Sequence, residues 1–390
     1  MTSPRTQHAA RNTRHERHVT TPASQEQWTT ALTSLPQPHV LQSWEWGVFK
    51  SRYGWQPARY LWIEGGRPCA AASVLSRRPG RRHPYKGAIL MARRHPHKGA
   101  ILMARWPAAV MYAPKGPALD YGDGALLEQV LAHLEAKARR ERALFVKIDP
   151  DVRADTEIGR AVVEMLQRRG WRASREQVQF RNTMLLDLAP SPDDLLAAMK
   201  SKWRYNVRLA TRKGVRVRRG TAADLPLLYA MYAETAARDG FVIRPEGYYR
   251  DAWGAFIEAG LAQPLIAEVD GEPVAMVLIF RFAARAWYMY GASRAIHRDK
   301  MPNHLLQWEA MQWAREQGCS TYDMWGAPDV LDESDPLWGV YRFKRGFDGE
   351  FVRHIGAWDF PASRMGYWLY TSVMPRALAT MRRAYWRRTR

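Results

Sequence analysis

The chain has 390 residues, which is long for a single hydrophobic core and suggests two domains of roughly 100 to 200 residues each. Apolar residues make up 46% of the sequence and 17 residues are Trp, so the composition excludes general disorder. The formal net charge of +21 indicates a polyanionic partner such as nucleic acid, a nucleotide sugar or an anionic membrane, although a basic surface that only maintains solubility has the same charge.

The cysteine content and the length of the apolar runs indicate the cellular compartment of the protein. Cys69 and Cys319 are the only cysteines and lie far apart, which excludes a disulfide framework and a thiolate metal cluster. The N-terminus lacks the apolar core of a secretion signal, and the longest apolar run, near residues 274–280, is far below the roughly 20 residues that span a bilayer. We therefore predict a soluble cytoplasmic protein without a metal site.

Residues 1–24 are polar, rich in Arg and His, and almost free of hydrophobic periodicity, so they are expected to form a disordered basic tail. The first ordered unit follows, with a β-hairpin that turns at Gly65-Gly66. Its predicted elements are strands at 58–64, 68–75 and 110–112, a helix through 127–138 and a buried strand at 144–148.

A tandem duplication interrupts this unit. Residues 81–92 are repeated almost verbatim as residues 93–104, with Tyr85 replaced by His97. Two copies cannot occupy one strand position, so we predict a surface insertion near 81–104, where extra residues cost little.

A helix with strong end signals joins the two halves. Ser191 is the expected N-cap, Pro192 begins the first turn and Gly214 follows the end. A basic stripe recurs every four residues along it, formed by Lys200, Arg204, Arg208 and Arg212. The stripe fits either a solvated helix face or a surface that follows nucleic-acid phosphates.

The second half repeats the order of elements found in the first. Strands at 265–269 and 273–282 form a hairpin through Asp270-Gly271, and a strand at 286–290, a helix ending near Gly318 and a strand at 321–325 follow. This order resembles a GNAT acyltransferase core. We therefore predict an α/β (α+β) fold of two tandem GNAT-like domains, with mixed, mostly antiparallel sheets flanked by helices.

The expected domain limits are 25–175 for the first domain and 176–360 for the second. A C-terminal helix at 361–390 is expected to return to the first domain and complete it. Its arginine-rich end, interleaved with Tyr385 and Trp386, suits peripheral contact with an anionic membrane, and a frayed basic tail explains the same composition.

Acetyl-CoA enzymes of the GNAT type cradle the pyrophosphate in a Gly-rich, Arg/Gln-containing loop before a helix. The corresponding segments here begin at Asp120 and at Arg298, and neither has this pattern. Six short motifs in order instead resemble the Fem family (FemABX) of peptidoglycan bridge-forming transferases, over about residues 38–360. They are Gln42-Ser-Trp-Glu-Trp-Gly, Tyr112-Ala-Pro-Lys-Gly-Pro-Ala-Leu-Asp120, Lys202-Trp-Arg-Tyr-Asn-Val-Arg208, Tyr288-Met-Tyr-Gly-Ala-Ser293, Leu306-Gln-Trp-Glu309 and Tyr341-Arg-Phe-Lys-Arg-Gly-Phe347.

The resemblance implies an aminoacyltransferase that moves Gly, Ala, Ser or a similar residue from aminoacyl-tRNA to a stem-peptide side-chain amine, with no cofactor. The acceptor is lipid II or UDP-MurNAc-pentapeptide, and the sequence leaves both open. Unlike the staphylococcal members, this chain has no long helical arm, because Arg219 leads almost directly into the next helix. A CoA-dependent N-acyltransferase and a non-catalytic basic nucleic-acid-binding protein are the alternatives.

The resemblance also implies residue roles. Lys344, beside Phe343, matches the position that steadies the aminoacyl-adenosine end and stabilises the tetrahedral intermediate. Asp120, which ends the segment beginning at Lys115, is the candidate carboxylate for the acceptor amine, although an Asp before Tyr-Gly-Asp-Gly often caps a helix. The residues expected to bind the acceptor's diphosphate and sugar are Lys50, Arg244, Tyr248 and Tyr290, with Lys115 also on the substrate side.

Overall fold

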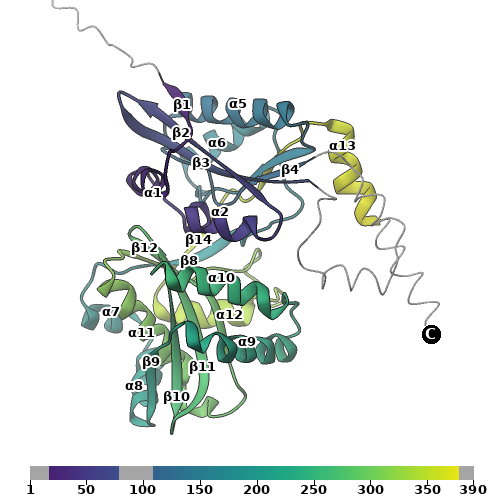
Figure 1. Cartoon of the computed structure of the whole chain (residues 1–390). Helices are drawn as coiled ribbons and strands as arrows, with labels where there is room; N and C mark the ends of the chain where they lie inside the picture. Colours follow the sequence, from purple (N-terminus) through teal and green to yellow (C-terminus); the bar gives the residue numbers. More distant parts are fainter. Residues whose placement is uncertain (1–16, 79–108, 377–390) are drawn as a thin grey trace, which may run out of the picture.

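The computed structural model describes residues 17–78 and 109–376. The expectations for residues 1–16, for the insertion at 81–104 and for the arginine-rich end beyond 376 therefore lie outside the described residues. The chain folds into two stacked units, each a sheet flanked by helices (Figure 1). The predicted α/β fold with two tandem GNAT-like domains is confirmed, because the two sheets repeat one strand order.

The first sheet has eight strands in the order β1-β2-β3-β4-β6-β15-β7, with β5 paired to β3. Only the pair β4 and β6 is parallel among the paired strands of this sheet that the structure describes. The strands are β1 (His18–Thr20), β2 (Gln56–Glu64), β3 (Arg67–Arg77), β4 (Val110–Ala113), β5 (Ala118–Leu119), β6 (Phe145–Ile148), β7 (Arg172–Ala173) and β15 (Trp358–Phe360). The helices are α1 (Gln25–Ser34), the 3-10 turn η1 (Val40–Gln42), α2 (Trp44–Ser51), α5 (Gly124–Arg140) and α6 (Glu157–Arg168).

The second sheet has seven strands in the order β14-β8-β13-β12-β11-β10-β9. Its strands are β8 (Asn182–Asp187), β9 (Val215–Arg219), β10 (Ala262–Val269), β11 (Glu272–Phe282), β12 (Arg285–Ser293), β13 (Thr321–Asp323) and β14 (Glu350–Arg353). Its helices are α7 (Pro192–Ala198), α8 (Ser201–Arg212), α9 (Leu225–Asp239), α10 (Glu246–Glu258), α11 (Pro302–Glu316) and α12 (Trp338–Lys344), with 3-10 turns η2 (Ala222–Asp224), η3 (Arg298–Lys300) and η4 (Arg345–Phe347).

Both predicted hairpins form at their glycine-containing turns. Gly65 and Gly66 have φ values of 57° and 78°, and Asp270 and Gly271 have 52° and 82°, which is the left-handed pair that a tight two-residue turn requires. Each hairpin is followed by a third strand, a helix and a parallel strand, as expected.

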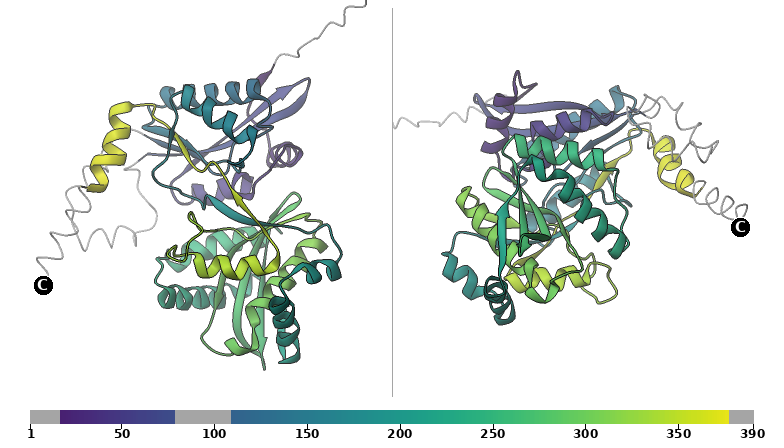
Figure 2. Two further views of the ribbon diagram at one scale, coloured as in Figure 1. Left: turned by 180° about the vertical axis from the view of Figure 1, so that it is seen from behind. Right: turned by 60° about the horizontal axis from the view of Figure 1, so that its bottom comes forward.

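The chain crosses between the two units twice, and the first sheet contains one strand, β15, from beyond the second unit. Strand β8 follows β7 in the chain but crosses into the second sheet, and β15 follows β14 but crosses back into the first. Each lies beside the parallel strand of its sheet, so they occupy equivalent places. Figure 2 shows from behind how the C-terminal segment runs up from the second unit to the first.

The return of β15 moves the expected domain limits. Residues 358–360 form β15 of the first sheet, whereas the sequence placed them in the second domain. The expectation of a disordered tail is wrong for His18–Thr20, which pairs with Leu61–Ile63 as an edge strand. Arg17 ties this strand down through ion pairs with Glu64 at 3.0 Å and Asp123 at 2.7 Å.

The apolar core falls into layers. One face of the first sheet packs on α5 and α6, and one face of the second packs on α7, α8, α11 and α12. The remaining helices form a shared layer between the units, in which Trp28 and Phe49 belong to the same buried cluster as Trp253 and Phe256. The interface is therefore an apolar core, with charged residues confined to a small part of it.

The helix expected from Ser191 to Lys213 is two helices. Ser191 caps α7 and Gly214 follows α8 at φ 78°, as predicted, but Met199 adopts ψ 151° and breaks the path. Arg204 donates to the carbonyls of Ala197 and Met199 at 2.5 and 2.6 Å, which satisfies the end of α7. Two residues join α8 to β9 and two more join β9 to η2, so the chain passes through this stretch without a helical arm.

The C-terminal helix lies against the first unit. It consists of α13 (Arg364–Trp368) and the π-helical turn η5 (Leu369–Val373). Tyr367 and Tyr370 pack their rings on Phe145, with centroids 5.6 and 5.4 Å away, and the Tyr367 hydroxyl donates to Asp359 at 3.0 Å. None of the helices within the described residues combines the length and apolar character of a bilayer-spanning segment.

Candidate functional site

A small cavity of about 170 Å³ lies between the two units and gathers three cations. Lys50 comes from α2, Arg77 from the end of β3, and Arg244 from the residues before α10. No Asp or Glu is among the described residues that line it, so we call it the cationic pocket. The lining residues are Trp46, Lys50, Tyr53, Trp55, Leu75, Arg77, Tyr112, Val178, Gln179, Arg244 and Tyr248.

The cations in this pocket are held by aromatic rings and repel one another. The Lys50 Nζ lies 3.4 Å from the Tyr248 hydroxyl, and the Arg244 guanidinium stacks 4.5 Å from the centre of the Tyr248 ring. Burial, together with the nearby Arg244 and Arg77, lowers the pKa of Lys50 to about 8. An anion would relieve this repulsion, and a diphosphate matches the number and type of the donors.

Three of the four residues expected to contact the acceptor's diphosphate and sugar therefore meet: Lys50, Arg244 and Tyr248. They come from both units, Lys50 from the first and Arg244 and Tyr248 from the second. Tyr290 packs behind the pocket against Trp253 and Tyr249, with ring centroids 5.3 and 6.0 Å away.

Sequence reasoning missed Arg77. It ends the observed strand β3, two residues beyond the strand predicted at 68–75, and its place before a basic insertion was the available signal.

Lys344 is buried at the end of α12, with only 4% of its surface exposed. Its Nζ donates to the carbonyls of Trp325 and Gly326, both at 2.6 Å. Burial lowers the pKa of Lys344 to about 7, although the carboxylate of Asp323 acts in the opposite direction. A lysine ammonium has three N–H groups, so one remains for another acceptor.

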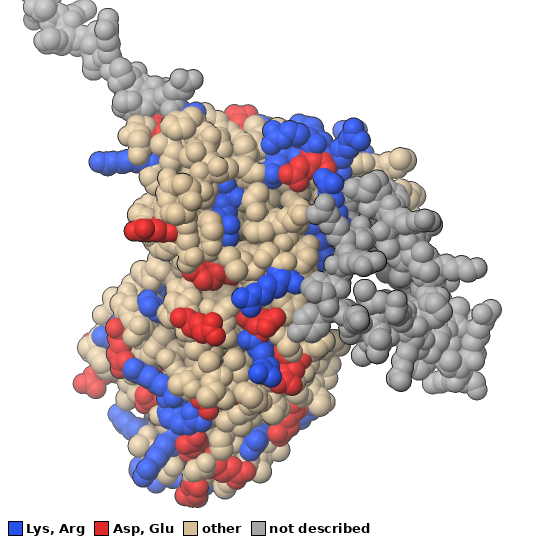
Figure 3. Space-filling model, viewed as in Figure 1, with Lys and Arg blue, Asp and Glu red and all other residues tan. Residues whose placement is uncertain are grey.

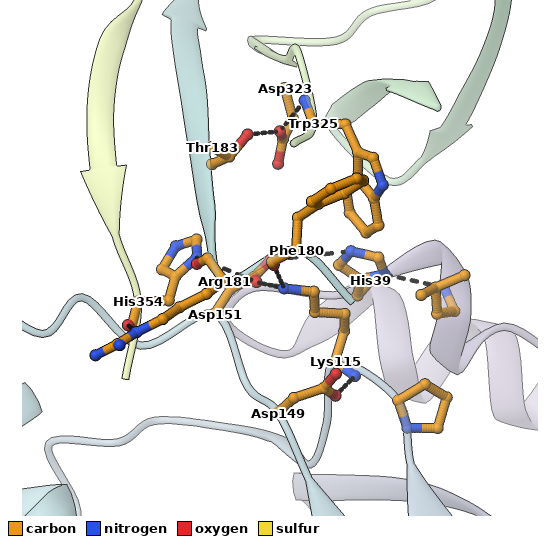
Figure 4. Close-up of polar contacts among 12 residues, drawn as sticks. His39, Lys115, Asp149, Asp151, Phe180, Arg181, Thr183, Asp323, Trp325 and His354 are labelled. Carbon is orange, nitrogen blue, oxygen red and sulfur yellow. Dashed lines mark hydrogen bonds and ion pairs between the residues drawn. The ribbon is translucent and has the colours of Figure 1, made fainter. Parts of the chain in front are cut away.

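The two carbonyls reach Lys344 because the chain turns sharply after β13. Trp325 has φ 55°, and its N–H donates to the Asp323 carboxylate at 2.8 Å, which also accepts from the Thr183 hydroxyl (Figure 4). A side chain on Gly326 would meet the Phe180 ring at 3.0 Å, so glycine fits this close approach. The turn thus fixes the lysine in one orientation.

Phe343 points elsewhere on the same helix. Its ring packs on His304 and Phe347 at centroid distances of 5.2 Å each, and its carbonyl accepts from Trp203 at 2.9 Å. This geometry gives Phe343 a packing role in the second unit.

A buried ionic cluster links the units beside this turn (Figure 4). Asp151 lies at its centre, 2.8 Å from the Lys115 Nζ and 3.3 Å from Arg285, with His354 and His39 at 3.6 and 3.9 Å. Burial alone would raise the pKa of Asp151, but Lys115 and the neighbouring cations hold it well below its ordinary value.

The cluster also occupies two of the three N–H groups of Lys115, whose Nζ bonds the Phe180 carbonyl at 3.2 Å as well. The hollow beside it has no room for a ligand. We interpret Lys115 as an interdomain link and not as a substrate contact.

Three hollows form one groove along residues 177–181, which cross from the first unit to the second. The cationic pocket shares Val178 and Gln179 with a hollow of about 380 Å³ that ends at Leu337, the residue before α12. On its other side it shares Trp55, Tyr112 and Val178 with a hollow of about 280 Å³ beside the C-terminal helix. The groove therefore extends from the cationic pocket to the residues just before α12, and Lys344, the last residue of α12, is not among the described residues that line it.

Asp120 lies outside this groove. Its carboxylate is exposed and accepts the Gly122 N–H at 2.8 Å, which closes a local turn before α5. Asp123 is the actual N-cap of that helix, because its side chain accepts from the Leu126 N–H at 2.9 Å.

The basic stripe is divided between two roles. Lys200, Arg208 and Arg212 are exposed, whereas Arg204 is occupied with the end of α7. Basic side chains, interspersed with acidic ones, gather over the edge of the second unit where α8 and β9 lie (Figure 3).

Comparison with known proteins agrees with this geometry. The model of the FemAB family matches residues 23–271 and 258–374. A lipid II:glycine glycyltransferase from Staphylococcus epidermidis is 23% identical over 90% of this chain and 94% of its own length, and one from Staphylococcus aureus is 23% identical over 88% and 93%. A crystal structure of FemX superposes with a TM-score of 0.77 at 22% identity, over 91% of this chain and 99% of FemX, and shows a shared fold. Since the family model matches most of the sequence, the chain belongs to the FemAB family.

Proposed function

We propose that this protein transfers an amino acid, Gly, Ala, Ser or a similar residue, from aminoacyl-tRNA to the stem-peptide side-chain amine of a peptidoglycan precursor. The observation that carries the proposal is the cationic pocket: Lys50, Arg77 and Arg244 converge there, no carboxylate is among its described lining residues, and the groove continues to Leu337 beside α12. Family membership and relatives named as lipid II:glycine glycyltransferases support the same reaction.

The precursor would bind along the groove. Its diphosphate would contact the three cations, and its sugar and peptide would follow residues 177–181 toward Leu337. The acceptor amine would then approach α12, the helix that carries Lys344. Both domains would hold the acceptor and the donor in a fixed relative orientation, which lowers the entropic part of the activation barrier.

The chemistry is aminolysis of an ester. The amine nitrogen forms a bond to the carbonyl carbon, the ester C–O bond breaks, and the released ribose hydroxyl takes up a proton while the amine loses one. Lys344 has one N–H free of the Trp325 and Gly326 carbonyls, and that donor would stabilise the oxyanion. With a pKa of about 7, Lys344 is poised to carry charge when a negative oxygen develops beside it.

The donor tRNA would contact the second unit. Lys200, Arg208 and Arg212 project from α8, and their spacing along one helix suits successive phosphates. This contact would contribute to the affinity for tRNA, whereas the transfer reaction would take place at the groove.

The test is a transfer assay with defined products. The full chain is incubated with a mixture of charged tRNAs and either lipid II or UDP-MurNAc-pentapeptide, and the acceptor is analysed by mass spectrometry. We expect a mass increase of one amino acid that requires charged tRNA. Transfer of an acyl group from CoA in place of an amino acid, or no product from either acceptor, would overturn the proposal.

A further inference from the structure

The hollow beside the C-terminal helix differs in chemistry from the rest of the groove. Val110 and Met111 of β4 and Phe145 of β6 form its floor, and Tyr370 and Met374 of the C-terminal helix form its wall. Its volume is about 280 Å³. This combination of side chains favours an apolar occupant.

Four of the described residues that line this hollow are charged: Arg175 and Glu176 are exposed, whereas Lys147 and Asp359 are buried and pair with each other. Lys147 pairs with Asp359 at 2.8 Å and also bonds the Ser174 hydroxyl. Both side chains are nearly buried, so the pair adds little net charge to the cavity. A polar ligand would find few free partners there, whereas an alkyl chain would displace water from carbon surface.

The hollow adjoins the cationic pocket. Trp55, Tyr112 and Val178 belong to both, so a diphosphate held by Lys50 and Arg244 would place one of its two substituents at the mouth of the apolar hollow. The other substituent would point along the groove toward Leu337. Along the groove, the lining therefore changes from mainly apolar beside the C-terminal helix to cationic in the pocket and then to polar near Leu337.

We propose that this hollow binds the first isoprenoid units of a lipid-linked acceptor whose diphosphate occupies the cationic pocket. The proposal rests on the proposed function and specifies its acceptor as a prenyl diphosphate and not a nucleoside diphosphate. The outer face of the same helix supports it, because Met365 and Trp368 are 73% and 56% exposed. Apolar and Trp side chains on an exposed helix suit the membrane interface from which such a chain would enter.

The experiment compares acceptors that differ only at the diphosphate. MurNAc-pentapeptide diphosphate is prepared as its methyl ester and as its geranyl ester, both used as monomers in solution, beside the UDP-linked form. We expect the KM of the geranyl ester to be at least about tenfold below that of the methyl ester, because about two buried methylenes suffice for a tenfold gain. Equal KM values for the two esters would overturn the prenyl site.

Two variants of the C-terminal helix make the test local. Met374→Glu places a charge in the hollow, and Val373→Glu places the same charge on the next residue, which is exposed and does not line it. The first should abolish the geranyl advantage while leaving the KM of the methyl ester unchanged, and the second should keep the advantage. Equal effects of the two variants would overturn the assignment. The assignment would also be overturned if only Met374→Glu lowered the melting temperature while the ratio of the KM values of the two esters stayed unchanged. That result would mean that part of the chain itself fills the hollow.

Failure of the proposed function is distinguishable from failure of this site. If no acceptor yields product with any charged tRNA, the transfer reaction is wrong. Calorimetry then tests the hollow without turnover, by comparing how tightly geranyl diphosphate and methyl diphosphate bind to the full chain. Tighter binding of the geranyl compound that Met374→Glu removes supports the site, and equal binding overturns it.

Discussion

Replacement of Lys344 by Met separates the catalytic and the structural consequences of a buried ammonium. The pKa of about 7, against an ordinary 10.5, means that burial disfavours the charged form by about 5 kcal/mol, at about 1.4 kcal/mol for each pH unit. The variant removes this cost but deprives the carbonyls of Trp325 and Gly326 of a donor, at about 1–3 kcal/mol each. The two effects are of similar size, so the free energy of unfolding at pH 7 should stay within about 2 kcal/mol of the wild type.

Turnover should respond much more strongly. Loss of one oxyanion donor lowers kcat by about 10² to 10³. We expect Lys344→Met to show this loss in single-turnover transfer from charged tRNA, with a modest change in tRNA affinity. A variant that is stable but inactive would identify the lysine as part of the chemistry, whereas intact turnover would refute its role.

The pH dependence of unfolding provides the second readout. Between pH 7 and 10.5 the unfolded chain binds a proton at Lys344 that the folded chain lacks, so this lysine makes the wild type more stable as pH rises through that window. Denaturant unfolding should show a slope of up to about 1.4 kcal/mol per pH unit that Lys344→Met removes. The exposed lysine Lys202 serves as the control, since Lys202→Met should keep the slope. If Lys344→Met keeps it too, the assumed burial of the ammonium is wrong.

Three further changes test the groove and the donor surface. Lys50→Met should raise the acceptor KM about 10- to 100-fold with little change in kcat. In the wild type, the acceptor KM should rise above pH 8, where Lys50 loses its proton, and the variant should lack this rise. An unchanged KM would exclude a diphosphate contact. Arg208→Glu combined with Arg212→Glu should weaken tRNA binding and reduce the salt dependence, measured by filter binding, by about 0.7 to 0.9 in log–log slope for each lost phosphate contact; an unchanged slope would place the tRNA elsewhere. Asp120→Asn should keep kcat within about threefold, since an amide oxygen also accepts from Gly122, whereas a general base would lose about 10² to 10⁴.

The elements predicted well are those with local signals. The two hairpins follow from Gly65-Gly66 and Asp270-Gly271, because left-handed residues at a two-residue turn determine the register on both sides. The caps of α7 and the end of α8 follow from Ser191 and Gly214 for the same reason. Such signals act within a few residues and need no knowledge of the rest of the fold.

The elements that were missed depend on distant partners. Met199 breaks the predicted helix because the Lys200 N–H bonds the Gly346 carbonyl at 3.0 Å, a contact across 146 positions that no local pattern encodes. Strands of two or three residues, such as β1 and β15, are too short to show an alternating pattern. Such short strands form because a sheet edge, or a gap between two strands of a sheet, is available to pair with them.

The candidate site shows the same division. Lys344 was predicted because it lies in the motif at 341–347, and Lys50, Arg244 and Tyr248 were predicted because they fit the family's pattern of a Lys in the first domain and an Arg and Tyr pair in the second. Arg77 was not, because a strand-end arginine has no distinctive neighbours and gains meaning only beside Arg244 of the other unit. Lys115 was assigned to the substrate side because an isolated lysine does not reveal that Asp151, 36 positions away, occupies its ammonium at 2.8 Å.

The two chain crossings explain why the site lies where it does. The first unit completes its sheet with β15, which follows the second unit in the chain, so two connecting segments cross at the interface. One of them, residues 177–181, lines the groove, and the other contains His354, which contacts Asp151 at 3.6 Å. Neither unit can therefore move away from the other without pulling on a sheet strand. A groove built on these crossings keeps the cations of Lys50 and Arg244 at a fixed separation although they belong to different units, and a diphosphate clamp needs that constancy to align an amine with an ester.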